Sequence, residues 1–338
     1  MNRTLALALT LGAASLAPST VRAQLVEVAR PDLGTACDDL DPVALADAID
    51  HEITILAKRS GERWKFGAFE TTVGDYVQKT LKPLAELARK GGPALCAGLA
   101  RFRFFRDPAG GAGKFTAYNN PLVKGSRRQH DAFQYAVYKR PGGELAKLTS
   151  GQIIDGGLAG KGLELAFLDD PVLVMRMHIE GSATVAFDDG STVNVGTDGS
   201  NGQQYQTMHT GEAIKELKKG LPQFWAYWKK NPKYVFFKER KEVGGGRFGG
   251  LVAGRSLAID PTTMPMGAAA WIRTDKPGIA DGKLSGWYSY GRVALLQDTG
   301  AAIKGPARVD VFIGTGDYAD FAAKQAARTG EIYILLSR

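Results

Sequence analysis

Glycine is the feature of this sequence that most constrains its fold. The chain has 42 glycines among 338 residues, well above the ~7% that is usual for soluble proteins. Glycine weakens helix interiors and favours tight turns, so its abundance predicts a turn-rich, mainly β architecture rather than a helical bundle. The hydrophobic share of 44% and the charged share of 23% are typical of a folded protein and exclude a largely disordered chain.

Residues 1–23 have the pattern of a secretory signal peptide. Arg3 supplies a positive start, residues 5–17 are apolar, and small residues around Ala23 form a cleavage site. The apolar run is too short to span a bilayer, and no later segment reaches the ~18 apolar residues that a spanning helix needs. No cysteine lies near the cleavage site to carry a lipid. We therefore expect a soluble protein of the periplasm with no membrane anchor.

The two cysteines, Cys37 and Cys96, both flank predicted helices. In an oxidising compartment they are expected to form one disulfide, although two free buried thiols remain the alternative. The formal net charge of +8 falls to +6 when Arg3 and Arg22 leave with the signal peptide (8 − 2). Such a moderately basic exported protein could favour an anionic polymer, either cell wall or nucleic acid.

Two helices are predicted in the N-terminal part. Residues 41–59 open with Asp at the N-cap and Pro at the first helical position, and apolar residues recur there at helical spacing. A second helix is expected over 72–90, with a break at Pro83 and a stop at the glycine pair that follows. We expect the disulfide to tie these two helices into a helical cap.

From about residue 115 the pattern becomes β-like. The stretch 172–199 alternates, which predicts strands with a hairpin turn at residues 188–190. Residues 211–230 return to helix, with Pro222 opening a second one. Glycine-rich residues 243–254 indicate a loop or a crossing between domains, and residues 316–338 are predicted as a helix followed by a final strand.

Most catalytic classes lack their motif in this chain. The four histidines are scattered without metal-ligand spacing, so no metal and no cofactor are expected. There is no G-x-S-x-G nucleophile elbow and no phosphate-binding loop. What remains is carboxylate chemistry, centred on residues 297–320 and their four aspartates: Asp298, Asp310, Asp317 and Asp320.

Asp310 is the best candidate among these four aspartates. It alternates with Val309 and Val311, and burial in such a strand raises the pKa of a carboxyl group toward the range of a general acid. The alternative is that Asp310 only caps a turn.

Several segments, in order, resemble the MltA family of lytic transglycosylases. They are "FTAYNNP" (115–121), residues 162–195, "GSNGQQY" (199–205), "NPKYVFF" (231–237), "GRSLAIDPTTMPMG" (254–267) and "QDTGAAIKGPARVDVFIGTGDYA" (297–319). The resemblance implies a double-psi β-barrel domain interrupted by a second β-rich domain. The barrel domain would comprise residues 24–123, with the N-terminal helices, and 243–338; the insert would be 124–242.

The resemblance also implies the activity. The family cleaves the β-1,4 bond between N-acetylmuramic acid and N-acetylglucosamine in peptidoglycan and leaves a 1,6-anhydro end, so the expected partner is the glycan strand and not nucleic acid. The muramyl 6-hydroxyl replaces water as the nucleophile, and a single carboxylate can act as acid and then as base. The family's catalytic aspartate matches Asp310, and Asp298 would tune it, whereas Asp317 and Asp320 are expected to be structural. The implied substrate-binding residues are Thr116, Tyr118, Glu180, Ser182, Asn201, Tyr205 and Lys304.

The sequence departs from the family pattern at three motifs. Asn119 replaces an aromatic residue, Glu180 replaces a glutamine, and residues 298–301 vary a glycine-rich element. Glu180 leaves two alternatives open: a hydrolase that uses Glu180 with Asp310, or a catalytically silent glycan-binding protein with the same fold.

Overall fold

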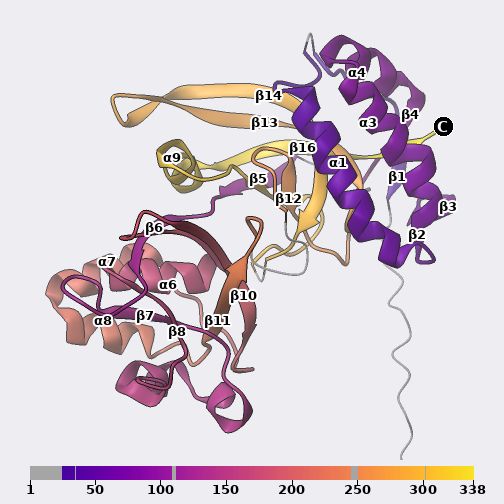
Figure 1. Ribbon diagram of the computed structural model, residues 1–338. Coiled ribbons are helices and arrows are strands. Elements are labelled where there is room, and N and C mark those ends of the chain that lie inside the picture. The colour runs from indigo at the N-terminus through magenta and orange to yellow at the C-terminus, as the bar shows by residue number, and fades with distance from the viewer. Residues whose placement is uncertain (1–24, 35, 109–111, 245–249, 301) are drawn as a thin grey trace, which may run out of the picture.

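The computed structural model describes residues 25–34, 36–108, 112–244, 250–300 and 302–338. The predicted signal peptide lies outside these residues. Within them, the strands form an eight-stranded sheet, a six-stranded sheet and the hairpin β2 (Arg63–Phe66) and β3 (Phe69–Thr72). Each of the two larger sheets carries its own hydrophobic core, and Figure 1 shows them as two bodies side by side.

Six strands of the larger sheet close into a barrel, because β16 pairs with both β13 and β5. Around the barrel the order is β5 (Gly113–Tyr118), β16 (Ala327–Ser337), β13 (Ala269–Ala280), β14 (Lys283–Asp298), β12 (Ser256–Ala258) and β15 (Arg308–Phe312). Strands β4 (Phe102–Arg106) and β1 (Val26–Val28) extend the sheet outward from β16. The mainly β fold with a closed barrel, predicted from the resemblance, is confirmed.

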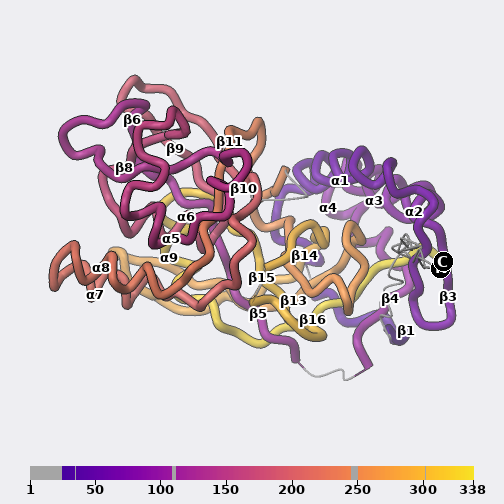
Figure 2. Tube along the Cα trace, turned by 90° about the horizontal axis from the view of Figure 1, so that it is seen from below, coloured from indigo at the N-terminus to yellow at the C-terminus, as the bar shows by residue number. Residues whose placement is uncertain are grey.

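Helices α1 (Pro42–Leu56), α2 (Val73–Tyr76), α3 (Lys82–Arg89) and α4 (Gly92–Gly98) cover the end of the barrel that faces away from the second body (Figures 1 and 2). The Asp41 side chain accepts a hydrogen bond from the Val43 amide, which fixes the start of α1 as predicted. A π-helical turn, η2 (Val77–Leu81), precedes Pro83, because proline cannot donate the next helical hydrogen bond. Short 3-10 turns, η1 (Ala57–Arg59) and η3 (Leu99–Arg101), follow α1 and α4.

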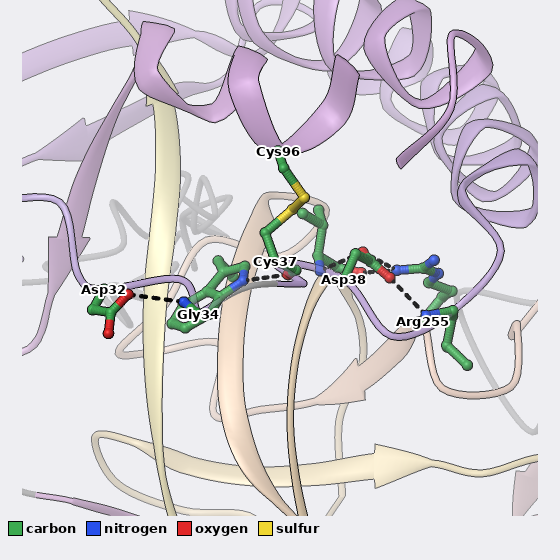
Figure 3. Close-up of a disulfide and its surroundings, with 9 residues drawn as sticks. Asp32, Gly34, Cys37, Asp38, Cys96 and Arg255 are labelled. Carbon is green, nitrogen blue, oxygen red and sulfur yellow. Dashed lines mark hydrogen bonds and ion pairs between the residues drawn. A yellow bond between two sulfur atoms is a disulfide. The ribbon is translucent and has the colours of Figure 1, made fainter. Parts of the chain in front are cut away.

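The predicted disulfide between Cys37 and Cys96 is confirmed, but Cys96 lies inside a helix and does not flank one. Cys37 lies in the loop before α1, and Cys96 lies in α4, a helix that forms after the expected stop at Gly91 (Figure 3). Next to the disulfide, Arg255 and Asp38 form an ion pair with both side chains buried. The N-terminal segment is therefore linked to α4 by the disulfide and to Arg255, the residue before β12, by the ion pair.

The second body contains the strands β6 (Leu122–Ser126), β7 (Tyr135–Tyr138), β8 (Glu164–Leu168), β9 (Ser182–Phe187), β10 (Thr192–Ser200) and β11 (Val235–Arg240). Its helices are α5 (Ser150–Gln152), α6 (Pro171–Glu180), α7 (Thr210–Lys219) and α8 (Leu221–Trp228), with a 3-10 turn η4 (Gly143–Lys147) and a π-helical turn η5 (Ile153–Gly157). Its core draws only on residues between Val123 and Phe237. This supports our inference that 124–242 is inserted into a domain made of 24–123 and 243–338.

The strand prediction for residues 172–180 is wrong, because this segment is helix α6. The Asp170 side chain accepts a hydrogen bond from the Val172 amide, and Pro171 occupies the first helical position. Gly181, with φ 79°, ends the helix in the left-handed conformation. These capping signals outweigh the apolar alternation between them. The hairpin of β9 and β10, the two helices around Pro222, and the final helix α9 (Asp317–Gln325) before β16 are confirmed.

Candidate active site

A cleft of about 510 Å³ lies between the barrel and the second body. The barrel contributes Tyr118, Ala258, Asp298 and Asp310, and the second body contributes His178, Glu180, Tyr205 and Asn231. The predicted acids and several predicted substrate-binding residues, which come from segments far apart in the sequence, thus meet in one place.

Strand register places the acids in one row across four neighbouring barrel strands. Asp310 of β15 is paired with Thr116 of β5 on one side and with Ala258 of β12 on the other. Ala258 is in turn paired with Asp298 of β14. Residues opposite one another on paired strands project from the same face of the sheet. The two aspartates therefore lie on either side of the Ala258 methyl group.

The carboxyl group of Asp310 is held by a hydrogen-bond chain of defined direction. Arg308 Nη1 donates to Thr116 Oγ1 (2.8 Å), so the threonine hydroxyl turns its proton toward Asp310 Oδ1 (2.5 Å). Oδ1 is thereby an acceptor, which leaves Oδ2 to carry the acidic proton. Burial raises the pKa of Asp310, as does the nearby Asp298, while the Thr116 hydrogen bond and Arg308 oppose this. The net direction is upward, as a general acid requires.

Asp298 lies in a different hydrogen-bonding environment. Its Oδ2 accepts a hydrogen bond from the Tyr118 hydroxyl (2.6 Å), and its Oδ1 accepts one from the Thr299 amide (2.8 Å). Burial raises the pKa of Asp298, and these two donors act in the opposite direction. Because both oxygens are occupied as acceptors, Asp298 is suited to stabilise positive charge in the cleft rather than to donate a proton.

Glu180 enters the cleft from the C-terminal end of α6. Its nearest cation is Arg176, with 3.8 Å between Glu180 Oε1 and Arg176 Nε. Arg176 also donates from Nη2 to Asp320 (2.9 Å) and to Asn119 (2.8 Å), so it connects the second body to the barrel. Burial raises the pKa of Glu180 to about 7, with smaller contributions from Asp310 and Asp320 in the same direction and opposition from Arg176.

The structure divides the other predicted substrate-binding residues into two groups. Tyr205 lines the cleft with 38% of its surface exposed. Asn201 is buried, and its amide bonds the backbone of Leu148, Pro232 and Tyr234. Ser182 is buried in β9, and Lys304 is exposed beside Asp260, outside the residues that line the cleft.

Three residues that line the cleft or contact its carboxyl groups and their partners were missed from the sequence. Arg308 could have been found, because residues two apart on a strand share a face with the catalytic candidate. Ala258 lies in the segment 254–267 that resembles the family, but only the pairing of the strands reveals its place between Asp298 and Asp310. Arg176 is four residues before Glu180, a spacing that brings side chains together only on a helix, and the segment had been predicted as strand.

Two negative findings concern the part of the chain that the structure describes. No group of three or more His, Cys, Asp or Glu side chains there is arranged to hold a metal ion. None of the helices in these residues is long and apolar enough to cross a membrane.

The comparisons with known proteins agree with one another. The MltA specific insert domain matches residues 144–238, and the 3D domain matches residues 255–336. A membrane-bound lytic murein transglycosylase A of Vibrio cholerae is 28% identical over 287 residues, 76% of each chain.

Two solved structures share the fold. MltA of Escherichia coli with bound chitohexaose has a TM-score of 0.74 at 21% identity, covering 94% of this chain and 96% of that one. The membrane-bound lytic murein transglycosylase of Agrobacterium tumefaciens has a TM-score of 0.70 at 24% identity, covering 93% and 98%. The family models, the relative and the fold thus agree in their similarity to the MltA family of lytic transglycosylases.

Proposed function

We propose that this protein is a peptidoglycan lytic transglycosylase of the cell envelope in which Asp310 is the single acid and base. The observation that carries the proposal is the directed chain from Arg308 through Thr116 to one oxygen of Asp310. It leaves one carboxyl oxygen, on a group with a raised pKa, facing a cleft that is lined from both bodies. The relatives in the MltA family supply the substrate class.

In the first step, Asp310 Oδ2 donates its proton to the oxygen of the bond between N-acetylmuramic acid and N-acetylglucosamine. The C–O bond breaks, the leaving sugar departs with its hydroxyl restored, and positive charge develops on the muramyl ring. Asp298, with both oxygens held as acceptors, stabilises that charge from the other side of Ala258.

In the second step, Asp310 is a carboxylate and accepts the proton of the muramyl 6-hydroxyl. The oxygen of that hydroxyl bonds to the anomeric carbon and closes the 1,6-anhydro ring. No water is consumed, and Asp310 ends the cycle protonated, so a single carboxyl group is sufficient. Tyr205 provides an exposed ring against which a sugar face can stack, and Glu180 provides a polar contact, both from the second body. Export to the periplasm, where this substrate lies, is part of the proposal.

The decisive experiment is mass spectrometry of peptidoglycan digested with the purified protein. The proposal requires products with 1,6-anhydromuramic ends. Asp310→Asn should lower the rate by about 10²–10⁴-fold, the usual contribution of a positioned acid-base group. The matched control is Asp317→Asn, because Asp317 is exposed at the start of α9 and does not line the cleft. An Asp310→Asn protein with full activity would remove Asp310 from its role.

A second candidate is a two-carboxylate hydrolase, and the observation in its favour is that Glu180 lines the same cleft with its pKa raised to about 7. It predicts reducing ends in place of anhydro ends, and loss of activity in Glu180→Gln. A silent glycan-binding protein would release no product at all. The same digest therefore separates the three functions.

A further inference from the structure

A second cavity, of about 260 Å³, is lined entirely by residues of the second body and shares none of them with the cleft. It is lined by residues of the sheet-edge strand β7 and its neighbour β8, of the turn η5 and of helix α8. No step of the proposed reaction uses it.

Six aromatic residues line this cavity, which we call the aromatic pocket: Tyr135, Tyr138, Phe167, Trp225, Trp228 and Tyr234. Five of these rings form a continuous series: Tyr135 to Trp225 (6.0 Å between ring centroids), Trp225 to Trp228 (5.8 Å), Trp228 to Tyr234 (6.5 Å) and Tyr234 to Tyr138 (6.5 Å). Tyr135 and Trp225 are half-buried, so the pocket is open to a ligand at their end.

Glu164 is the one charged residue among those that line the aromatic pocket. It is paired with Tyr138 across β7 and β8, so its carboxyl group stands beside the rings. Its Oε1 accepts a hydrogen bond from the Gly160 amide (2.9 Å), and no Lys, Arg or His side chain of the described residues forms an ion pair with it. The half-buried carboxylate of Glu164, next to electron-rich ring faces, therefore lacks a positively charged partner among the described residues.

This chemistry selects one class of ligand. Ring faces and a carboxylate both attract positive charge, and nothing in the wall compensates an anion. A neutral sugar would use the rings but would not need the charge. We propose that the aromatic pocket binds a primary ammonium group. If the proposed function holds, on which this identification rests, the ligand is the free side-chain amine of the diamino acid in a peptidoglycan stem peptide.

The aromatic pocket adjoins the cleft through one layer of side chains. His178 lines the cleft, and its ring packs against Tyr234 (4.3 Å between centroids) and Trp228 (5.2 Å), which line the pocket. The Val235 amide donates to His178 Nδ1 (3.1 Å), which fixes the orientation of the ring. A ligand in the pocket therefore contacts the same rings that support one wall of the cleft.

The test uses the full chain and two synthetic tripeptides of the sequence L-Ala–γ-D-Glu–L-Lys. One has a free lysine amine, and in the other that amine is acetylated. Calorimetric titration should show that the acetylated tripeptide binds at least about tenfold more weakly, the loss expected for one charge-assisted contact. Added salt should weaken binding of the free amine.

Variants locate the site. Glu164→Gln keeps an oxygen for the Gly160 amide but removes the charge, and it should weaken binding of the free amine about tenfold or more. Trp225→Ala should weaken it as well, because one cation-attracting ring is lost. The matched control is Glu144→Gln, an exposed glutamate of η4 that pairs with Lys147, and it should bind as the parent does. Circular dichroism confirms that each variant is folded.

Equal affinity for the two tripeptides, no binding, or binding that is unchanged in Glu164→Gln would overturn the proposal. Binding of an N-acetylglucosamine oligomer that is lost in Trp225→Ala, with no binding of either tripeptide, would assign the pocket to sugar instead. The titration needs no turnover, so it is independent of the digest. Tripeptide binding without anhydro products would leave the ammonium site standing and remove the proposed function.

Discussion

The Thr116 hydroxyl donates a 2.5 Å hydrogen bond to Asp310 although 194 positions separate the two residues in the chain. They are paired on the parallel strands β5 and β15, so the register of the barrel sets this contact. Arg308, two residues before Asp310, donates a hydrogen bond to the oxygen of the same hydroxyl. The contact orients the proposed acid and lowers its pKa against the upward effect of burial.

Replacing Thr116 by valine removes this contact and leaves the shape almost unchanged. We expect kcat/KM to fall by about ten- to a hundredfold, because a hydrogen bond to a charged group contributes about 1.5–3 kcal/mol. The bond favours the ionised form, so its loss raises the pKa of Asp310, and the decline of activity at alkaline pH should move to higher pH. Thr116→Ser, which keeps the hydroxyl, is the control. An unshifted pH profile in the valine variant would contradict this role.

Ala258 lies between the two aspartates and is among the residues that line the cleft. Ala258→Val adds two methyl groups between them. We expect kcat/KM to fall by at least about tenfold, since a small misplacement of substrate can cost up to ~10²-fold. Ala258→Ser should keep most of the activity. A fully active valine variant would show that the substrate does not pass between the acids.

Glu180 should make stability fall as pH rises. Burial raises the pKa of Glu180 to about 7 from an ordinary value of 4.5, so between these values the unfolded chain releases a proton that the folded chain retains. Below pH 4.5 the group has no effect, and above pH 7 its full cost is present, about 3 kcal/mol from the conversion of pKa to free energy.

Glu180→Gln should therefore be more stable than the parent at pH 8 and equal to it at pH 4, as measured by urea unfolding. Glu216→Gln, at the Lys219 ion pair of α7, should show no such dependence on pH. Equal stability of the Glu180 variant and the parent at both pH values would contradict the burial of a neutral carboxyl group.

The disulfide should contribute substantially to stability. It joins residues 59 apart, and closing a loop of that length in the unfolded chain corresponds to about 4 kcal/mol in the entropy model. We expect the double variant Cys37→Ser, Cys96→Ser to lose about this free energy of unfolding, and reduction of the parent to produce the same loss. A double variant within about 1 kcal/mol of the parent would show that the buried Arg255–Asp38 pair holds the N-terminal segment without the disulfide.

Local signals in the sequence were sufficient for much of the fold. Proline at a first helical position predicted α1, and alternation between Val309 and Val311 predicted that Asp310 lies on a strand. The error at residues 172–180 arose because the prediction relied on the alternation of apolar residues there. It did not take into account that Asp170 and Gly181 are helix-capping residues.

The site was less predictable, because strand register decides it. No local pattern indicates that Ala258 lies between Asp298 and Asp310. Nor does one indicate that the Asn201 side-chain amide is occupied by hydrogen bonds to the backbone. The resemblance to family motifs identified segments that contribute to the cleft. It could not distinguish residues that line the cleft, such as Tyr205, from residues whose side chains hydrogen-bond the backbone, such as Asn201. Arg176 was missed for a related reason, since its contact with Glu180 exists only once that segment is helical.

The closure of the barrel by β16 has a consequence for biosynthesis. Strand β16 follows β5, β12, β13, β14 and β15 in the chain, and its pairing with β5 sets Ala327 opposite Thr116. A nascent chain that has not yet reached residue 327 has every proposed catalytic residue but an open sheet. In that open sheet β5 pairs with β15 alone, so the strand that carries Thr116 gains its second barrel neighbour only after all the proposed catalytic residues have been made.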